Sequence, residues 1–111
     1  MTQNKPIHKI EYYDKEKTIK YSEHWKINGE YHREDGPAAI FYYRNESIHR
    51  KEYYINNKLH REDGPAVITY YTDGSIWYEY YNLNGIEYSK EEYLNLMSPQ
   101  NRIKVLLNET E

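Results

Sequence analysis

The string His-Arg-Glu-Asp-Gly-Pro-Ala occurs twice without change, at residues 32–38 and 60–66, so the two copies lie 28 residues apart. The same offset aligns further pairs of residues: Ile40 with Ile68, Tyr42 with Tyr70, Tyr43 with Tyr71, Ser47 with Ser75 and Asn56 with Asn84. Repetition at a fixed period is typical of chains built from stacked units, each of which buries its apolar surface against the next. The repeat therefore predicts an array of similar units.

The chain of 111 residues has room for one such array and not for a second domain. We divide this single repeat domain, 1–111, into a degenerate first repeat (1–31), two full repeats (32–59 and 60–88) and a terminal segment (89–111).

Each repeat contains turn signals between β-forming runs. Asn28-Gly29 and Asn84-Gly85 favour two-residue hairpin turns, because Gly and Asn tolerate positive φ. β-branched and aromatic residues fill the segments between turns: 37–43, 48–55, 65–71 and 75–83, with short return strands at 30–32, 58–60 and 86–88. The fold is predicted to be mainly β, an antiparallel meander of stacked β-hairpin repeats. Because the period of 28 is even, equivalent side chains fall on the same sheet face.

The terminal segment changes character. Ser89 followed by Glu92 is a capping-box pattern, and Ser98-Pro99 offers a second helix start. Two short helices are therefore predicted to form a C-terminal α-helical cap over the last repeat. We expect this cap to bury its aliphatic residues: Ile103, Val105, Leu106 and Leu107.

Charge and composition narrow the classes of partner. The formal net charge is −3, whereas nucleic acids and anionic membranes attract clustered Lys and Arg, so neither partner is expected. No cysteine is present, and the polar start of the chain lacks the apolar stretch of a signal peptide. We therefore expect a cytoplasmic protein, or one in the host cytoplasm if the source is viral.

The repeat units resemble a known family. The order strand, Asn-Gly, short return, His-Arg-Glu-Asp-Gly-Pro-Ala, strand, Asp-Gly, strand is similar to the MORN-variant repeats of bacterial, bacteriophage and giant-virus proteins, over about residues 19–88. The resemblance implies an elongated β-hairpin array that serves as a protein-interaction scaffold, and some bacterial variants are antitoxins. It implies no catalytic residues.

The repeated charged string has a structural interpretation. A base, a cation and two carboxylates superficially suggest acid/base catalysis, but an enzyme builds one convergent pocket and seldom repeats it along a thin sheet. We expect Asp35 and Asp63 to close tight turns, and Arg33 and Arg61 to pair with carboxylates of the neighbouring unit. No enzyme activity, metal site or cofactor is predicted.

The tyrosines are the main binding candidates, because there are 15 of them and alternation along a strand sends some to each face. Tyrosine offers a large, rigid contact area and is enriched at protein interfaces. The candidate partner-binding residues are Tyr42, Tyr43, Tyr53, Tyr54, Tyr70, Tyr71, Tyr78 and Tyr80.

The sequence favours a non-catalytic protein-binding module, in its narrower form a bacteriophage or bacterial stoichiometric inhibitor of a host defence or toxin protein. Two alternatives remain open. One is a small-ligand protein for a nucleotide or phosphoinositide, bound by His32, Arg33, His60 and Arg61. The other is a structural, self-assembling protein that forms a homodimer through the edge strand near residues 8–13.

Overall fold

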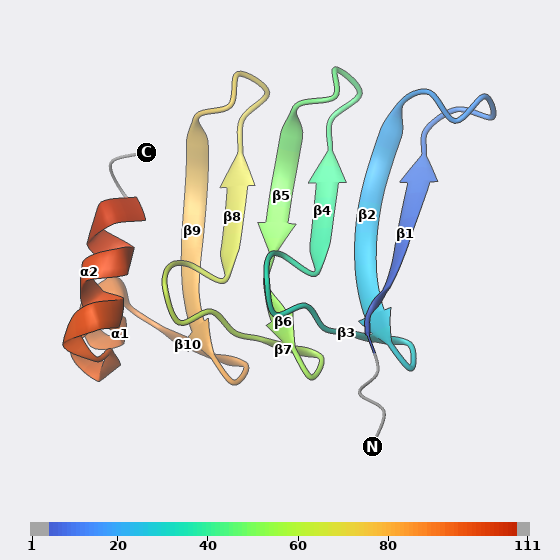
Figure 1. Ribbon diagram of the computed structural model, residues 1–111. Coiled ribbons are helices and arrows are strands. Elements are labelled where there is room, and N and C mark those ends of the chain that lie inside the picture. The colour runs from blue at the N-terminus through green and yellow to red at the C-terminus, as the bar shows by residue number, and fades with distance from the viewer. Residues whose placement is uncertain (1–4, 109–111) are drawn as a thin grey trace.

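Long antiparallel strands follow one another across the molecule in chain order, and two helices lie beyond the last hairpin (Figure 1). The structure is a computed structural model that describes residues 5–108. The molecule measures 47 × 44 × 20 Å, so it is thin in one direction. The prediction of a mainly β, antiparallel meander with a short helical cap is confirmed.

The main sheet has the strand order β1-β2-β4-β5-β8-β9-β10, with β3 beside β2, while β6 and β7 form a separate pair. The long strands are β1 (Ile7–Tyr12), β2 (Lys20–Ile27), β4 (Ala39–Tyr42), β5 (Ile48–Glu52), β8 (Val67–Tyr70) and β9 (Ile76–Leu83). The short strands and helices are β3 (Glu30–Tyr31), β6 (Tyr54–Ile55), β7 (Lys58–Leu59), β10 (Ile86–Tyr88), α1 (Lys90–Leu96) and α2 (Pro99–Asn108).

The predicted strand over 48–55 is wrong in its second half, because it breaks at Tyr53. The N–H of Tyr53 still donates to Ala66 at 2.7 Å, but its carbonyl accepts from His60 at 3.0 Å. Beyond this point the chain leaves β8 and forms the β6–β7 pair.

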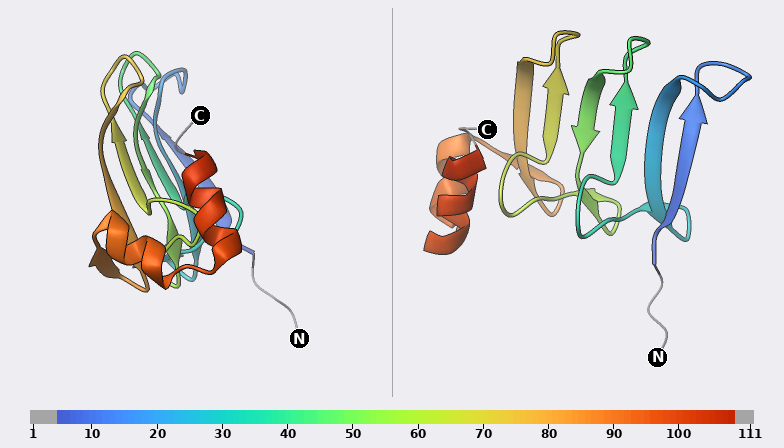
Figure 2. Two further views of the ribbon diagram at one scale, coloured as in Figure 1. Left: turned by 90° about the vertical axis from the view of Figure 1, so that its left-hand side faces the viewer. Right: turned by 45° about the horizontal axis from the view of Figure 1, so that its top comes forward.

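The two faces of the main sheet differ in what covers them. In the left view of Figure 2, helix α2 and the connecting loops lie on one side of the strands. We call this side the loop face; it carries Trp25, Lys51 and Ile68. The opposite side is the open face, and cross-strand register places Arg50, Thr69 and Tyr78 on it.

Aromatic rings and guanidinium groups alternate along the loop face, and we call Trp25, Arg33, Tyr53 and Arg61 the ring–guanidinium stack. Cζ of Arg33 lies 3.8 Å from the ring centroid of Trp25, and Cζ of Arg61 lies 4.1 Å from that of Tyr53. The His8 ring stacks on Trp25 with the centroids 4.2 Å apart. Each arginine thus contacts an aromatic ring of the preceding repeat.

The expected pairing of Arg33 and Arg61 with carboxylates of a neighbouring unit is wrong. Nε of Arg33 donates to Asp35 at 3.0 Å and its Nη1 to the carbonyl of Pro37 at 3.1 Å. Arg61 makes the same bonds to Asp63 and to Pro65. An aspartate two residues along the same loop is closer than any carboxylate of the next unit. Each of these arginines therefore contacts the preceding repeat through an aromatic ring and not through an ion pair.

Helix α1 continues the packing where the repeats stop. Its N-cap Ser89 forms the predicted capping box with Glu92. The buried Tyr93 ring lies 4.9 Å from Tyr81, and its hydroxyl donates to the carbonyl of Arg61 and accepts from the N–H of Gly64. Tyr93 thus covers the last repeat loop.

The expectation that the cap buries its aliphatic residues is mostly wrong. Val105 is 1% exposed and joins the core of Tyr81, Tyr93 and Met97. Ile103, Leu106 and Leu107 are 57%, 47% and 62% exposed, because the sheet covers only one narrow side of α2.

Gly64→Ala tests the stack. A Cβ at this position would lie 2.9 Å from Cζ of Arg61, so the guanidinium would have to leave its place over Tyr53. We expect a loss of about 1–3 kcal/mol in the free energy of unfolding, measured by urea denaturation. In an Arg61→Ala background the same change should cost less than about 0.5 kcal/mol. An equal loss in both backgrounds would contradict the explanation.

Candidate functional site

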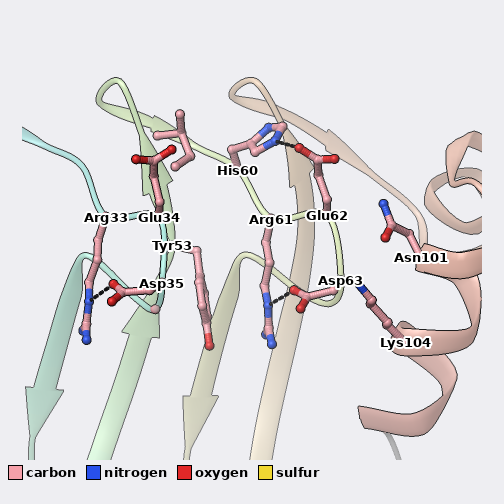
Figure 3. A pocket seen from close by; sticks show the side chains of 12 residues that line it. Arg33, Glu34, Asp35, Tyr53, His60, Arg61, Glu62, Asp63, Asn101 and Lys104 are labelled. Carbon is pink, nitrogen blue, oxygen red and sulfur yellow. Dashed lines mark hydrogen bonds and ion pairs between the residues drawn. The ribbon is translucent and has the colours of Figure 1, made fainter. Parts of the chain in front are cut away.

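The two charged loops and α2 enclose a cavity of about 590 Å³ (Figure 3). Figure 3 shows the side chains of Arg33, Tyr53 and Arg61 side by side, with Tyr53 between the two arginines. Asn101 and Lys104 of α2 line the far side. Of the four residues predicted for the alternative ligand site, Arg33, His60 and Arg61 line this cavity and His32 does not.

The four residues proposed for ligand binding have structural partners. Nδ1 of His32 accepts from the N–H of Asn56 at 3.0 Å, and Nδ1 of His60 accepts from the N–H of Asn84 at 2.9 Å. Nε2 of His60 lies 3.0 Å from Glu62. Arg33 and Arg61 are bonded to their own loops and stacked on rings, as described above. These groups stabilise the loops, so phosphate would have to compete with existing partners.

No three His, Cys, Asp or Glu side chains within residues 5–108 are arranged to hold a metal ion. His32 and His60 belong to successive loops and each binds the backbone of a different turn.

A second cavity, of about 440 Å³, opens on the loop face around Lys51. Nζ of Lys51 lies 5.8 Å from the Tyr70 ring centroid, and no carboxylate within the described residues pairs with it. Burial and, secondly, the positive charge of Arg61 lower the pKa of Lys51. The position holds a cation that the fold itself does not neutralise.

Five of the eight candidate tyrosines lie outside the last hairpin's exposed ring cluster and contact other parts of the fold. The hydroxyl of Tyr43 donates to the carbonyl of Tyr70 at 2.7 Å, which ties the second hairpin to the third. Tyr42 donates to Glu23, and burial and this hydrogen bond raise the pKa of Tyr42. Tyr54 donates to Glu52, and burial, followed by the charge of Glu52, raises its pKa to about 12. Tyr53 belongs to the ring–guanidinium stack, and Tyr70 lines the Lys51 cavity.

The other three candidates lie together with Trp77, and we call Tyr71, Trp77, Tyr78 and Tyr80 the aromatic cluster. Ring centroids are 5.5 Å apart for Tyr71 and Trp77, 5.3 Å for Trp77 and Tyr78, and 5.0 Å for Tyr78 and Tyr80. Tyr71, Trp77 and Tyr80 are 47%, 55% and 41% exposed. The cluster is a continuous aromatic surface on the last hairpin.

Trp77 owes its position to a β-bulge. Each of the three hairpins shifts register near its turn, so that one residue has no opposite partner: Tyr21, His49 and Trp77. Each bulged residue contacts the tyrosine at the end of the preceding strand, Tyr13, Tyr43 or Tyr71. Bulges redirect side chains, so Tyr21, His49 and Trp77 occupy equivalent positions in the three hairpins.

The third hairpin differs from the other two in what surrounds this bulge. The positions of Tyr78 and Tyr80 are occupied by Arg50 and Glu52 in the second hairpin. Nη1 of Arg50 donates to the hydroxyl of Tyr78 at 3.2 Å, above Thr69, which is 1% exposed. The other hairpins form without tyrosine at these two positions, since the first hairpin has Ser22 and His24 there. The hairpin geometry therefore does not require them.

Sequence reasoning did not select Trp77. The sequence does contain an indication that Trp77 is a binding candidate, since it is one of only 2 Trp residues and lies within a run of tyrosines. Its direction depends on the bulge, which simple alternation does not reveal.

Comparison of the chain with protein-family models, with curated proteins and with solved structures finds no significant match. Neither helix within residues 5–108 has the length and apolar character needed to cross a membrane.

Lys51→Met should stabilise the protein at neutral pH by about 1 kcal/mol, because it removes an unpaired, half-buried cation and keeps the packing. Below the lowered pKa, the folded and unfolded states both hold the proton, so the burial cost is fully present. Between that pKa and about 10.5 the folded state releases its proton first, so the advantage of the variant shrinks. Urea denaturation at several pH values, with exposed Lys9→Met as control, measures the difference. A variant no more stable than the parent at neutral pH would contradict this interpretation.

Proposed function

We propose that this protein is a non-catalytic binding module that recognises another protein through the aromatic cluster. The observation that carries the proposal is the continuous ring contact of the cluster, in which Tyr71, Trp77 and Tyr80 are exposed and Tyr78 is partly buried between them. Trp and Tyr dominate the binding energy of protein interfaces, because they bury large areas at little cost in conformational entropy.

The internal comparison of the hairpins supports the same proposal. Arg50 and Glu52 stand at the positions of Tyr78 and Tyr80. Exposed aromatic side chains that the fold does not need are typical of interaction surfaces. The resemblance of the units to MORN-variant repeats, which act as interaction scaffolds, agrees with this function.

The charged loops support a binding role over an enzymatic one. Arg33, Asp35, Arg61 and Asp63 form ion pairs within their loops, and both arginines stack on rings. Groups held in this way are less available for acid/base chemistry. A stoichiometric inhibitor of a host defence or toxin protein is the narrower form of the proposal.

Trp77→Ala should weaken binding of the partner about tenfold or more, since a central interface tryptophan commonly contributes 2 kcal/mol or more. The measurement is affinity capture from lysate of the source cell, with the retained protein quantified by mass spectrometry. Tyr21→Ala is the matched control, because Tyr21 is 44% exposed at the equivalent bulge of the first hairpin.

The control should retain the partner as well as the parent protein does, and circular dichroism should show both variants folded. Equal capture by parent and Trp77→Ala would contradict the proposal. Capture of a small molecule beside Lys51 with no protein would contradict it as well.

A further inference from the structure

The outer edge of β9 beside the aromatic cluster has no strand partner among the described residues. β10 pairs with β9 only at Leu83, Asn82 and Tyr81. In the left view of Figure 2, which looks toward β9, the helices lie low and to one side, and the upper part of β9 is uncovered. The segment Ile76–Tyr80 is therefore an open edge.

The backbone of Glu79 provides the free hydrogen-bonding groups. Val67 lies opposite Tyr80, and the carbonyl of Tyr80 accepts from the N–H of Ala66 at 2.8 Å, so the backbone of Tyr80 points toward β8. Successive residues of a strand direct their backbone groups to opposite sides. The N–H and C=O of Glu79 therefore point outward, away from β8.

The equivalent edges of the first two hairpins each bind a strand. Glu23 and Lys51 occupy the positions of Glu79 in the first and second hairpins. An antiparallel strand lies beside each of them, with Ile40 opposite Glu23 and Ile68 opposite Lys51. In the third hairpin the same edge, with the same backbone direction, is open.

We propose that the outer edge of β9 at Tyr78–Tyr80 receives an extended strand of a partner protein, with a basic residue opposite Glu79. This inference rests on the proposed protein-binding function and specifies how the partner binds. Strand addition supplies affinity through main-chain hydrogen bonds and specificity through alternate side chains. The partner's residues on the open face lie beside Tyr78 and Tyr80, where β-branched and aromatic side chains pair well.

Charge favours a foreign strand over a second copy of the chain. The exposed carboxylate of Glu79 has no ion pair or hydrogen bond within the described residues. Pairing of β9 with itself supplies no cation, because Ile76–Tyr80 contains none. Pairing with β1 in the repeated geometry would place Ile10 opposite Glu79, as Ile10 and Ile40 lie opposite Glu23. Glu23 tolerates this because its own hairpin supplies His8 and Lys20 as ion-pair partners, which Glu79 lacks within residues 5–108. A basic residue of a partner strand opposite Glu79 forms the ion pair that the chain itself does not supply.

The test uses a peptide that copies residues 37–43, the strand that already binds the edge carrying Glu23, with Ile40→Lys opposite Glu79. We expect it to slow hydrogen exchange of the Glu79 amide and to shift the Glu79 and Trp77 NMR signals in a millimolar titration. A second peptide with Ile40→Glu should bind about fivefold more weakly, because like charges then face each other.

Two controls make the test decisive. Methylation of the peptide nitrogen at position 40 removes the donor to the Glu79 carbonyl and should abolish binding. The protein variant Glu79→Lys should reverse the preference and bind the Ile40→Glu peptide better.

The proposal is overturned if no peptide affects Glu79, if the methylated peptide binds equally well, or if the protein forms a dimer that protects the Glu79 amide. In the first two cases, loss of the natural partner on Trp77→Ala would leave the proposed function standing and show that side chains alone form the contact.

Discussion

Contact between arginine and an aromatic ring joins successive repeats of this protein on the loop face, beside the strand pairing that continues the sheet. A molecule only 20 Å across in its thin direction offers little apolar volume, and charged residues make up 30% of the chain. Arg33 and Arg61 each bring a planar guanidinium onto a ring of the preceding repeat, while Asp and a proline carbonyl accept hydrogen bonds from its Nε and Nη1. Burying each guanidinium is favourable here because an aromatic ring, an aspartate and a proline carbonyl all interact with it. The seven-residue string is thus the unit of this contact, in which Gly leaves room for the guanidinium.

The same contact explains how the array ends. After the second string the motif does not occur again, and Tyr93 of α1 instead packs on Tyr81 and hydrogen-bonds to the last loop. The cap covers the lower part of β9 and leaves the edge at Ile76–Tyr80 open. The end of the array is therefore where aromatic side chains and free backbone groups occur together. The arginine–ring contacts and the exposed aromatic cluster therefore lie in different parts of the sheet.

Much of the fold follows from the sequence, because turns and caps are local. Asn-Gly turns, the return strands and the capping box at Ser89 depend on residues within a few positions of one another. The direction of Trp77 does not follow, because a bulge interrupts the alternation on which such predictions rest. The strand break at Tyr53 and the partners of Arg61 also depend on contacts between distant segments. Composition identified the tyrosines as candidates but could not separate those that hold the fold from those left exposed.

A double-mutant cycle between Tyr53 and Arg61 tests the central claim most directly. Tyr53→Leu, Arg61→Met and the double variant would each be unfolded in urea, and the coupling free energy derived from the four proteins. Because the ring and guanidinium lie 4.1 Å apart, the account predicts a favourable coupling of about 1 kcal/mol. Additive losses, with a coupling below about 0.3 kcal/mol, would show that the units are held together by other contacts.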